Sequence, residues 1–260
     1  MMYRKALLRI LAVGLAGWCG RVADAGLVAH WSFDETNGTQ VAESSGSVNL
    51  NGVARTATAT GGVDLAAAGV FNTGVSLDGV AGSYLTIPYL DGVHRNSFTM
   101  AAWVNPSDTG INTILSDWSS VWGFRFFLTT QVVMDHRYAS GANTYSVSGG
   151  TVQVGQWQHV AITWDRPSKT ATLYFNGTNI ASVVSTQSGA NLDVVNNNRN
   201  YHIGWKQDFT DTFNGSLDEL WVFNQALSEK QVRELSAGNS VTLYEGRMGI
   251  NFRGGGGSGT

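Results

Sequence analysis

The sequence is poor in cysteine, proline and charged residues, and each shortage excludes a class of protein. Its 260 residues include one cysteine, Cys19, and three prolines, so a small scaffold held together by disulfide bonds is excluded. Charged residues make up 13% of the chain, about half of the ~25% that is average for soluble proteins. Because the solvent faces of a helical bundle need Lys, Glu and Arg, this shortage argues against a mostly helical fold.

Glycine and aromatic residues are plentiful by comparison. The chain contains 32 glycines and nine tryptophans, and aromatic residues account for 11% of it. This apolar surface is large enough to form a core, so a disordered chain is excluded. The glycines indicate many tight turns between short elements.

Residues 1–25 have the three parts of a secretory signal. A basic start is followed by the apolar run ALLRILAVGLAG and by an Ala-Asp-Ala triplet that ends at Ala25. We therefore expect cleavage after Ala25 and a secreted or cell-surface protein. The run is interrupted by Arg9 and is shorter than the ~20 residues of a membrane-spanning helix, so we expect no transmembrane segment. Cys19 suggests a lipid anchor as an alternative, but the bulky Trp18 before it disfavours one.

The charge balance bears on the partners of the chain. Its formal net charge is −3, and the part beyond the basic leader is more acidic still. No basic stripe is present that could neutralise phosphates, so we expect no nucleic-acid partner. Beyond the leader the chain also lacks cysteine, so its stability must come from a large core, to which a bound metal can add.

Short runs rich in Val, Ile, Thr and aromatic residues recur along the chain with turn residues between them. More than ten such runs, among them LVAHWSF, FTMAAWV and GSLDELWVF, predict a β-sandwich or barrel. In QWQHVAITW, Val160 and Ile162 alternate with His159 and Thr163, which predicts a half-buried strand with His159 in a structural role on its polar side. Farther along, Asn176-Gly177 predicts a hairpin turn.

One helix is predicted, over residues 229–236. Ser228 and Gln231 have the spacing of a capping box, and Leu227 can pack onto Val232 as a hydrophobic staple. Beyond this helix the pattern fades into a glycine-rich end. The expected organisation is a signal peptide over 1–25, one domain over 26–238 and a flexible tail over 239–260.

Six segments follow one another in a distinctive order: LVAHWSFDETNGTQVAESSG, GVSLDGVAGSYLTIP, NSFTMAAWV, GQWQHVAITWD, TLYFNG and FNGSLDELWVFNQALSEKQVREL. Together they cover about residues 27–238, and they resemble the LamG-like jelly-roll domain of the concanavalin A-like group, which includes laminin G modules and pentraxins. The resemblance implies an all-β jelly-roll β-sandwich of two antiparallel sheets, with one concave face and one short C-terminal helix. It implies no single function, because the fold serves binding modules, adhesion domains and glycosidases.

The pair Asp218-Glu219 interrupts the apolar pattern of its strand. Leu217 before the pair and Leu220 after it have opposite parity, so both face the core only if a β-bulge lies between them. A bulge frees backbone carbonyls from the ladder. Carbonyls beside carboxylates suit Ca²⁺, which takes six to eight oxygen ligands.

The resemblance adds a calcium site to this reading. Similar concanavalin A-like domains bind a structural Ca²⁺ where the first strand meets the penultimate one. By motif, this places Asp34 of WSFDE and Asp218 of SLDEL near one ion. The alternative is that these acids block a sheet edge or accept hydrogen bonds from turn amides.

Loop tryptophans mark a second candidate site. Trp118, Trp122 and Trp205 stand among polar residues outside the clearest strands, and Asp208 follows the last of them. Tryptophan stacks on the apolar faces of sugar rings while Asp, Asn and Gln bind hydroxyls, so these four residues predict a carbohydrate-binding surface. The alternative is burial of the tryptophans under the rim of the sandwich.

Catalytic motifs are missing from the sequence. Retaining glycosidases on related jelly rolls resemble one another in carrying Glu-x-Asp-x-x-Glu on a single strand, and acids two or four residues apart share one face of a strand. Nowhere in this chain do two acids stand two or four residues apart. A nucleophile elbow, a zinc-type histidine spacing and a phosphate loop are also missing. We therefore expect no catalytic residues.

These observations predict a secreted, non-catalytic binding or adhesion module for carbohydrate or a cell-surface glycan, stabilised by calcium. Two alternatives stay open. The first is a structural cell-surface domain that binds protein. The second is a polysaccharide-active hydrolase or lyase with carboxylates from separate strands.

Overall fold

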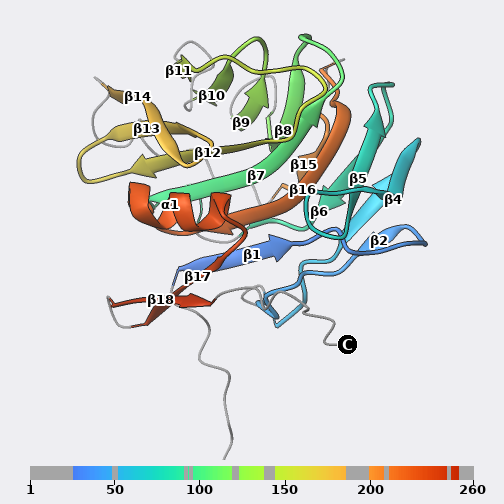
Figure 1. The fold of residues 1–260 in the computed structure, drawn as a ribbon, viewed down its shortest axis with the longest axis horizontal. Helices are drawn as coiled ribbons and strands as arrows, with labels where there is room; N and C mark the ends of the chain where they lie inside the picture. The colour runs from blue at the N-terminus through green and yellow to red at the C-terminus, as the bar shows by residue number, and fades with distance from the viewer. Residues whose placement is uncertain are drawn as a thin grey trace, which may run out of the picture.

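In the computed structural model of this chain, two eight-stranded antiparallel sheets stack on one another and one short helix packs on them (Figure 1). This architecture confirms the predicted all-β sandwich with a short C-terminal helix. The expected signal peptide lies outside the described residues. The structure describes residues 26–48, 52–90, 93, 96–118, 123–137, 144–185, 199–207, 211–244 and 247–251.

The first sheet, sheet A, is centred on the two longest strands, β7 and β16. In spatial order it contains β14 (Thr178–Val184), β13 (Thr170–Phe175), β12 (Gln158–Asp165), β7 (Phe98–Pro106), β16 (Asn214–Phe223), β5 (Thr73–Asp78) and β4 (Val63–Ala68). Strand β1 (Leu27–Trp31) also pairs with β16, outside this row.

The second sheet, sheet B, is made mostly of strands from the middle of the chain. In spatial order it contains β11 (Thr144–Gly149), β10 (Val132–Arg137), β9 (Gly123–Leu128), β8 (Asn112–Ser116), β15 (Tyr201–Ile203), β6 (Tyr84–Ile87), β3 (Ala57–Thr60) and β2 (Gln40–Val41).

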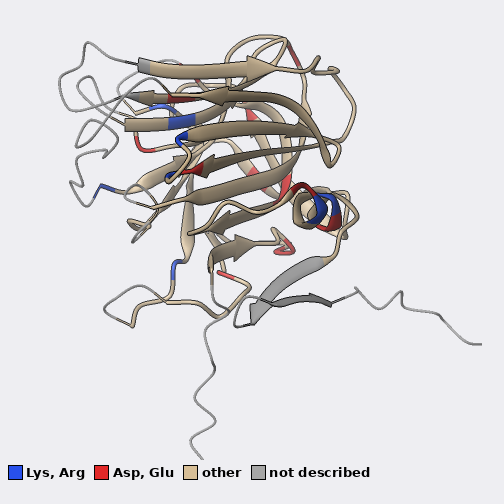
Figure 2. Cartoon of the chain, turned by 90° about the vertical axis from the view of Figure 1, so that its left-hand side faces the viewer, with Lys and Arg blue, Asp and Glu red and all other residues tan. Residues whose placement is uncertain are grey.

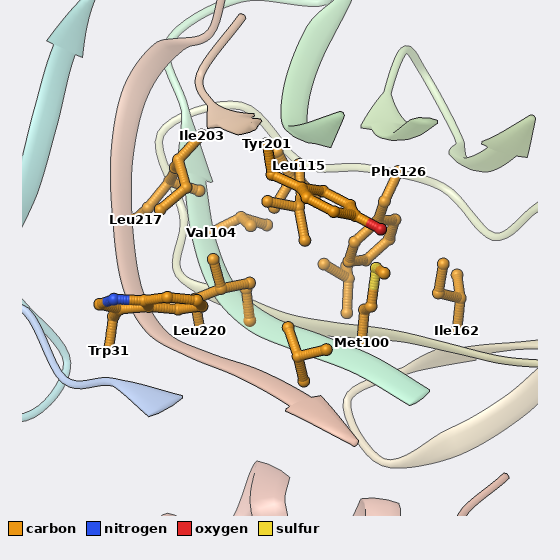
Figure 3. Close-up of a cluster of buried hydrophobic side chains, with 14 of the residues drawn as sticks. Trp31, Met100, Val104, Leu115, Phe126, Ile162, Tyr201, Ile203, Leu217 and Leu220 are labelled. Carbon is orange, nitrogen blue, oxygen red and sulfur yellow. The ribbon is translucent and has the colours of Figure 1, made fainter. Parts of the chain in front are cut away.

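The core fills the space between the inner faces of the two sheets. Successive side chains of a strand point to opposite faces. Met100 and Ile162 of sheet A therefore meet Leu115 and Phe126 of sheet B, and all four are completely buried (Figure 3). Burial of one such side chain contributes about 1.5–3 kcal/mol. A core of this extent stabilises the sandwich without a disulfide bond.

Strand β16 contains the bulge that its sequence predicts. Asp218 pairs with Trp103 of β7, but Trp221 pairs with Ala101, so β16 has one residue more than its partner over this stretch. Glu219 has a left-handed backbone with φ of 53°. The leucines on the two sides of the bulge both reach the core as a result. At this point the second partner of β16 also changes from β5 to β1.

Helix α1 (Glu229–Ser236) forms as the sequence predicts. The Ser228 side chain accepts a hydrogen bond from the backbone N–H of Gln231, whose own side chain accepts one from the backbone of Ser228, which completes the capping box. Val232 and Leu235 of α1 are buried. The helix also carries several of the sparsely distributed charged residues (Figure 2).

Helix α1 covers the outer face of sheet A. Its Val232 shares a hydrophobic cluster with Ala161, Trp221 and Leu227. The half-buried pattern predicted for β12 is therefore wrong, since all of its residues except the last are buried. His159, predicted on a polar face, is 1% exposed.

Two hairpins follow from local sequence. Phe175 pairs with Thr178, so the turn between β13 and β14 is Asn176-Gly177, with φ of 49° and 76°, as the sequence predicts. Strands β17 (Ser240–Tyr244) and β18 (Arg247–Asn251) pair with each other, in a stretch for which the sequence predicts a flexible tail; residues 252–260 lie outside the described residues. In the described part of the chain, no helix is long and apolar enough to cross a membrane.

Candidate functional site

Asp218 is completely buried at the bulge of β16. Its Oδ2 accepts hydrogen bonds from the backbone N–H groups of Val70, at 2.8 Å, and Phe71, at 2.9 Å. Its Oδ1 is buried with no hydrogen-bond partner among the described residues. Burial raises the pKa of Asp218 to about 7, because a carboxylate without water is harder to ionise. A cation at Oδ1 would supply the missing interaction.

Asp34 contacts the same turn, which joins β4 to β5. Asn72 Nδ2 donates to Asp34 Oδ1 over 3.2 Å. The neighbouring Thr73 hydroxyl donates to the carbonyl of Phe33 over 3.1 Å. Both Phe33 and Asn72 have left-handed backbones, with φ of 54° and 56°, which lets the two segments meet closely. The structure therefore places Asp34 and Asp218 against one turn, residues 69–73.

The groups around this turn are oxygens, as a hard cation requires. Besides Asp218 Oδ1, Glu35 Oε2 is buried without a hydrogen-bond partner in the described part of the chain, and the backbone carbonyls of Phe33 and Glu35 both face the Thr73 hydroxyl. The described residues contain no group of three or more His, Cys, Asp and Glu side chains arranged to hold a metal. The residues present fit Ca²⁺ only as a few carboxylates completed by backbone carbonyls.

The other acid of the bulge already has a partner. Glu219 Oε2 lies 2.7 Å from Nε2 of His30, and the His30 ring stacks on Trp221 with centroids 3.4 Å apart. Sequence reasoning missed this pair, because its two residues come from β1 and β16, which are 189 residues apart in the sequence although the strands are neighbours. Of the two neighbouring acids, Asp218 is the one with a buried oxygen left for a cation.

Three aromatic rings gather on the outer face of sheet B. Alternation along β15 would place Trp205 on the inner side with Ile203, but Gly204 between them has a left-handed φ of 83° and redirects the chain. Trp205 therefore stacks on Tyr84 of β6, with centroids 4.6 Å apart and planes at 19°. His202 meets the Trp205 ring edge-on at 5.0 Å. We call Tyr84, His202 and Trp205 the aromatic platform.

A network of charges lies on the same face. Arg125 of β9 donates to Asp211 over 2.8 Å and to Asp135 of β10 over 3.0 Å. Its guanidinium stacks over Phe127, 3.6 Å from the ring centroid. Lys206 forms an ion pair with Asp211, and burial lowers the pKa of its ammonium group. The network is thus neutral in sum, and its side chains are 9–18% exposed beside Trp205.

The structure describes two of the four residues predicted to bind carbohydrate. Trp205 is half-buried in the aromatic platform. Trp118 is only 5% exposed, and the Arg125 guanidinium lies 5.6 Å from its ring centroid. Trp118 thus belongs to the same face, where it offers little surface of its own. Trp122 and Asp208 lie outside the described residues.

Sequence reasoning missed other members of this face. Tyr84, His202 and Arg125 each stand at an outward position of a strand. Alternation along the strands marks such positions, but it does not tell which outward residues of different strands become neighbours.

A known family profile matches most of the domain. Residues 77–233 match the sequence profile of the concanavalin A-like lectin/glucanases superfamily, of laminin G type.

Curated proteins of similar sequence include pentraxin-related protein PTX3. The Mus musculus protein is 23% identical over 146 residues, which are 53% of this chain and 38% of the relative. The Homo sapiens protein is 24% identical over 156 residues, 56% of this chain and 40% of the relative. The chain therefore spans about two fifths of the length of these relatives.

Solved structures show the same fold. Domain 4 of AbnA, a GH43 extracellular arabinanase from Geobacillus stearothermophilus in complex with arabinotriose, has a TM-score of 0.62 and 22% identity, over 82% of this chain and 99% of that one. The binding domain of Paraclostridial Mosquitocidal Protein 1 has a TM-score of 0.64 and 16% identity, over 81% and 52% of the two chains. The receptor binding domain of botulinum neurotoxin type G has a TM-score of 0.62 and 16% identity, over 82% and 51%.

Proposed function

The chain belongs to the concanavalin A-like lectin/glucanases superfamily, and from that membership we propose that it is a secreted, non-catalytic carbohydrate-binding module stabilised by calcium. The observation that carries the proposal is the aromatic platform beside the charged network on the outer face of sheet B. Domain 4 of AbnA, which matches this fold over 99% of its own length and was solved in complex with arabinotriose, supports such a role for a domain of this fold.

The chemistry of this face suits a sugar. A sugar ring has an apolar face of C–H groups, which packs on an aromatic ring, and hydroxyls that need hydrogen-bond partners. The half-buried Trp205 supplies aromatic surface, while Lys206 and Asp211 supply a donor and an acceptor beside it. These groups are held in place by ion pairs and stacking, so little conformational freedom is lost when a ligand binds.

Replacement of Trp205 tests the proposal. We expect the purified protein to bind glycans on an array and to be retarded on polysaccharide gels. We expect Trp205→Ala to weaken this binding by up to about tenfold, because one stacking contact contributes up to about 1.5 kcal/mol. Trp103→Ala is the matched control, because Trp103 is another half-buried tryptophan but lies on the outer face of sheet A.

Three outcomes would contradict the proposal. Equal glycan binding by wild type and Trp205→Ala would exclude the aromatic platform as the binding site. Absence of glycan binding together with self-association or capture of a cell-envelope protein would favour the structural alternative. Release of reducing ends from a polysaccharide, lost on replacement of one carboxylate, would make the protein an enzyme.

The calcium part of the proposal concerns a site beside the turn at residues 69–73. Asp218 and Asp34 would hold the ion, with carbonyls such as that of Phe33 completing its shell. Asp218 Oδ1, which is buried and has no hydrogen-bond partner among the described residues, supports this assignment. Bound there, Ca²⁺ would supply positive charge between the start of the domain and β16, and would tie the two together.

Thermal unfolding tests for the ion. A ligand that binds only the folded state raises the free energy of unfolding by about 2.7 kcal/mol when its free concentration is one hundred times its Kd. We therefore expect the melting temperature to fall with EDTA and to recover with Ca²⁺. Asp218→Ala should lower the melting temperature and make it insensitive to EDTA, while Asp64→Ala, at an exposed acid of β4, should respond as wild type does. An unchanged melting temperature after chelation, with no metal by elemental analysis, would refute the calcium site.

A further inference from the structure

A cavity of about 330 Å³ opens at the end of the sandwich where both sheets contribute. Such a volume falls in the ~300–1,000 Å³ range of small-molecule sites and is far larger than an ion requires. Its walls come from the end of β5, the loop between β7 and β8, and the start of β16. The residues that define its chemistry are Asp78, Asp108, Ile111, Asn112, Asp211 and Asn214.

Asp108 is fixed in this cavity by hydrogen bonds from three groups. Asn214 Nδ2 donates to its Oδ2 over 2.8 Å, and the Gly110 N–H donates to its Oδ1 over 2.8 Å. Asn112 Nδ2 donates to the same Oδ1 over 3.1 Å, while Asn112 Oδ1 accepts from the backbone N–H of Asn214 over 2.7 Å. The wall is therefore rigid before any ligand arrives, which favours binding.

Asp78 is held in a similar way on the opposite wall. Its Oδ1 accepts a hydrogen bond from the Val80 N–H over 3.0 Å. Its Oδ2 lies against Gly62, where an added Cβ would stand 2.0 Å from it. Hydrogen bonds lower the pKa of Asp78, chiefly the one from Val80, and that of Asp108, chiefly the one from Asn214. Both side chains are thus carboxylates at neutral pH.

The two carboxylates have no positive partner in the described part of the chain. Every hydrogen bond to Asp78 and Asp108 comes from an amide or a hydroxyl, in contrast to Asp211, which is paired with Arg125 and Lys206. The cavity therefore offers acceptors and two uncompensated negative charges. Ile111 adds an apolar surface at its rim and is 43% exposed.

This chemistry defines a ligand that donates hydrogen bonds and carries no negative charge. We propose that the cavity is a subsite for an uncharged or amino sugar unit and that it rejects sugar units bearing a carboxylate. Hydroxyl or ammonium groups of the ligand donate to Asp78 and Asp108, and its C–H face packs on Ile111. A ligand carboxylate would meet like charges at short range, which costs binding energy.

The cavity adjoins the aromatic platform through Thr212, which pairs with Trp205, so this inference rests on the proposed glycan-binding function and deepens it. Asp211 belongs to both the cavity and the charged network. A glycan with one unit on Trp205 can place a neighbouring unit in the cavity. The platform then supplies general affinity for sugars, and the cavity selects among them.

A glycan array with neutral, amino and carboxylate-bearing glycans tests the selectivity. We expect wild type to bind neutral or amino glycans at least about tenfold more tightly than carboxylate-bearing glycans of the same length. Asp78→Asn and Asp108→Asn should each weaken the binding of neutral or amino glycans several-fold. They should also reduce the ratio between the affinities for these glycans and for carboxylate-bearing glycans. Asp64→Asn is the matched control, since Asp64 also accepts from the N–H two residues later but is not among the residues that line the cavity.

Failure of this inference is distinguishable from failure of the proposed function. If wild type binds no glycan, both fall. If wild type binds glycans through Trp205 but both Asp→Asn variants keep its affinity and selectivity, the cavity is not a subsite. A wild-type preference for carboxylate-bearing glycans overturns the inference as well. Asp78 is exposed, so Asp78→Asn decides the question even if Asp108→Asn fails to fold.

Discussion

A buried histidine makes the stability of this protein depend on pH in a predictable way. His159 of β12 is 1% exposed, and neither of its ring nitrogens has a hydrogen-bond partner among the described residues. Its ring meets Trp103 edge-on at 5.6 Å. Burial lowers the pKa of His159 from 6.5 to about 3, because a charged imidazolium would lose its water without gaining a partner.

The sign and size of the effect follow from proton linkage. The unfolded chain protonates His159 below pH 6.5, while the folded chain resists protonation down to about pH 3. The unfolded state therefore binds more protons across this window, and stability falls as the pH falls through it. Between about pH 8 and about pH 5, this one group removes about 2 kcal/mol from the free energy of unfolding.

Urea unfolding at the two pH values, followed by tryptophan fluorescence, measures the effect. The variant His159→Phe keeps a ring against Trp103 and cannot titrate, and His159→Leu checks that aromaticity is not the cause. Every other titrating group is shared, so its contribution cancels when wild type and variant are compared. We expect wild type to lose about 2 kcal/mol more than either variant. Equal losses in all three proteins would show that folded His159 accepts a proton, and would refute the reasoning.

Two further predictions concern the elements that shape the domain. Leu220→Ala should lower the free energy of unfolding by about 2–5 kcal/mol, because the bulge turns this side chain into the core, where it is 1% exposed; Val184→Ala, at an exposed position of β14, should change it by less than about 0.5 kcal/mol. Ser228→Ala should cost about 1 kcal/mol through loss of the cap on α1, and Ser228→Asp should restore most of it. Urea unfolding measures both changes. A loss of free energy of unfolding well below about 2 kcal/mol for Leu220→Ala would contradict the first prediction. A loss for Ser228→Asp as large as that for Ser228→Ala would contradict the second.

Features that depend on neighbouring residues could be predicted from the sequence. The Asn176-Gly177 turn and the Ser228 capping box each need only a few consecutive residues, and the structure has both. The bulge at Asp218-Glu219 could be inferred because its two flanking leucines have opposite parity. In each case a few consecutive residues are enough to determine the local backbone conformation.

Features that depend on distant segments could not be predicted. His159 was expected on a polar face because nothing in β12 indicates that α1 and its surroundings cover that side. The pairing of His30 with Glu219 requires β1 to lie beside the end of β16, and the cavity around Asp108 joins three segments that are remote in sequence. Alternation along β15 would place Trp205 on the inner face of sheet B, but the left-handed Gly204 before it turns the side chain to the outer face. Such contacts are set by how sheets and helix dock, which alternation within a strand does not encode.

The two proposed sites lie on different outer faces of the sandwich. On sheet A, α1 packs over the strands, and the buried oxygen of Asp218 lies near the turn that Asp34 contacts. On sheet B, the aromatic platform and the partly exposed charged network lie on the outer side of the strands, and the hydrophobic core separates them from Asp218. A calcium ion at Asp218 would therefore stabilise the fold without touching a glycan on Trp205. The calcium proposal and the carbohydrate proposal rest on different residues, and either can be refuted while the other stands.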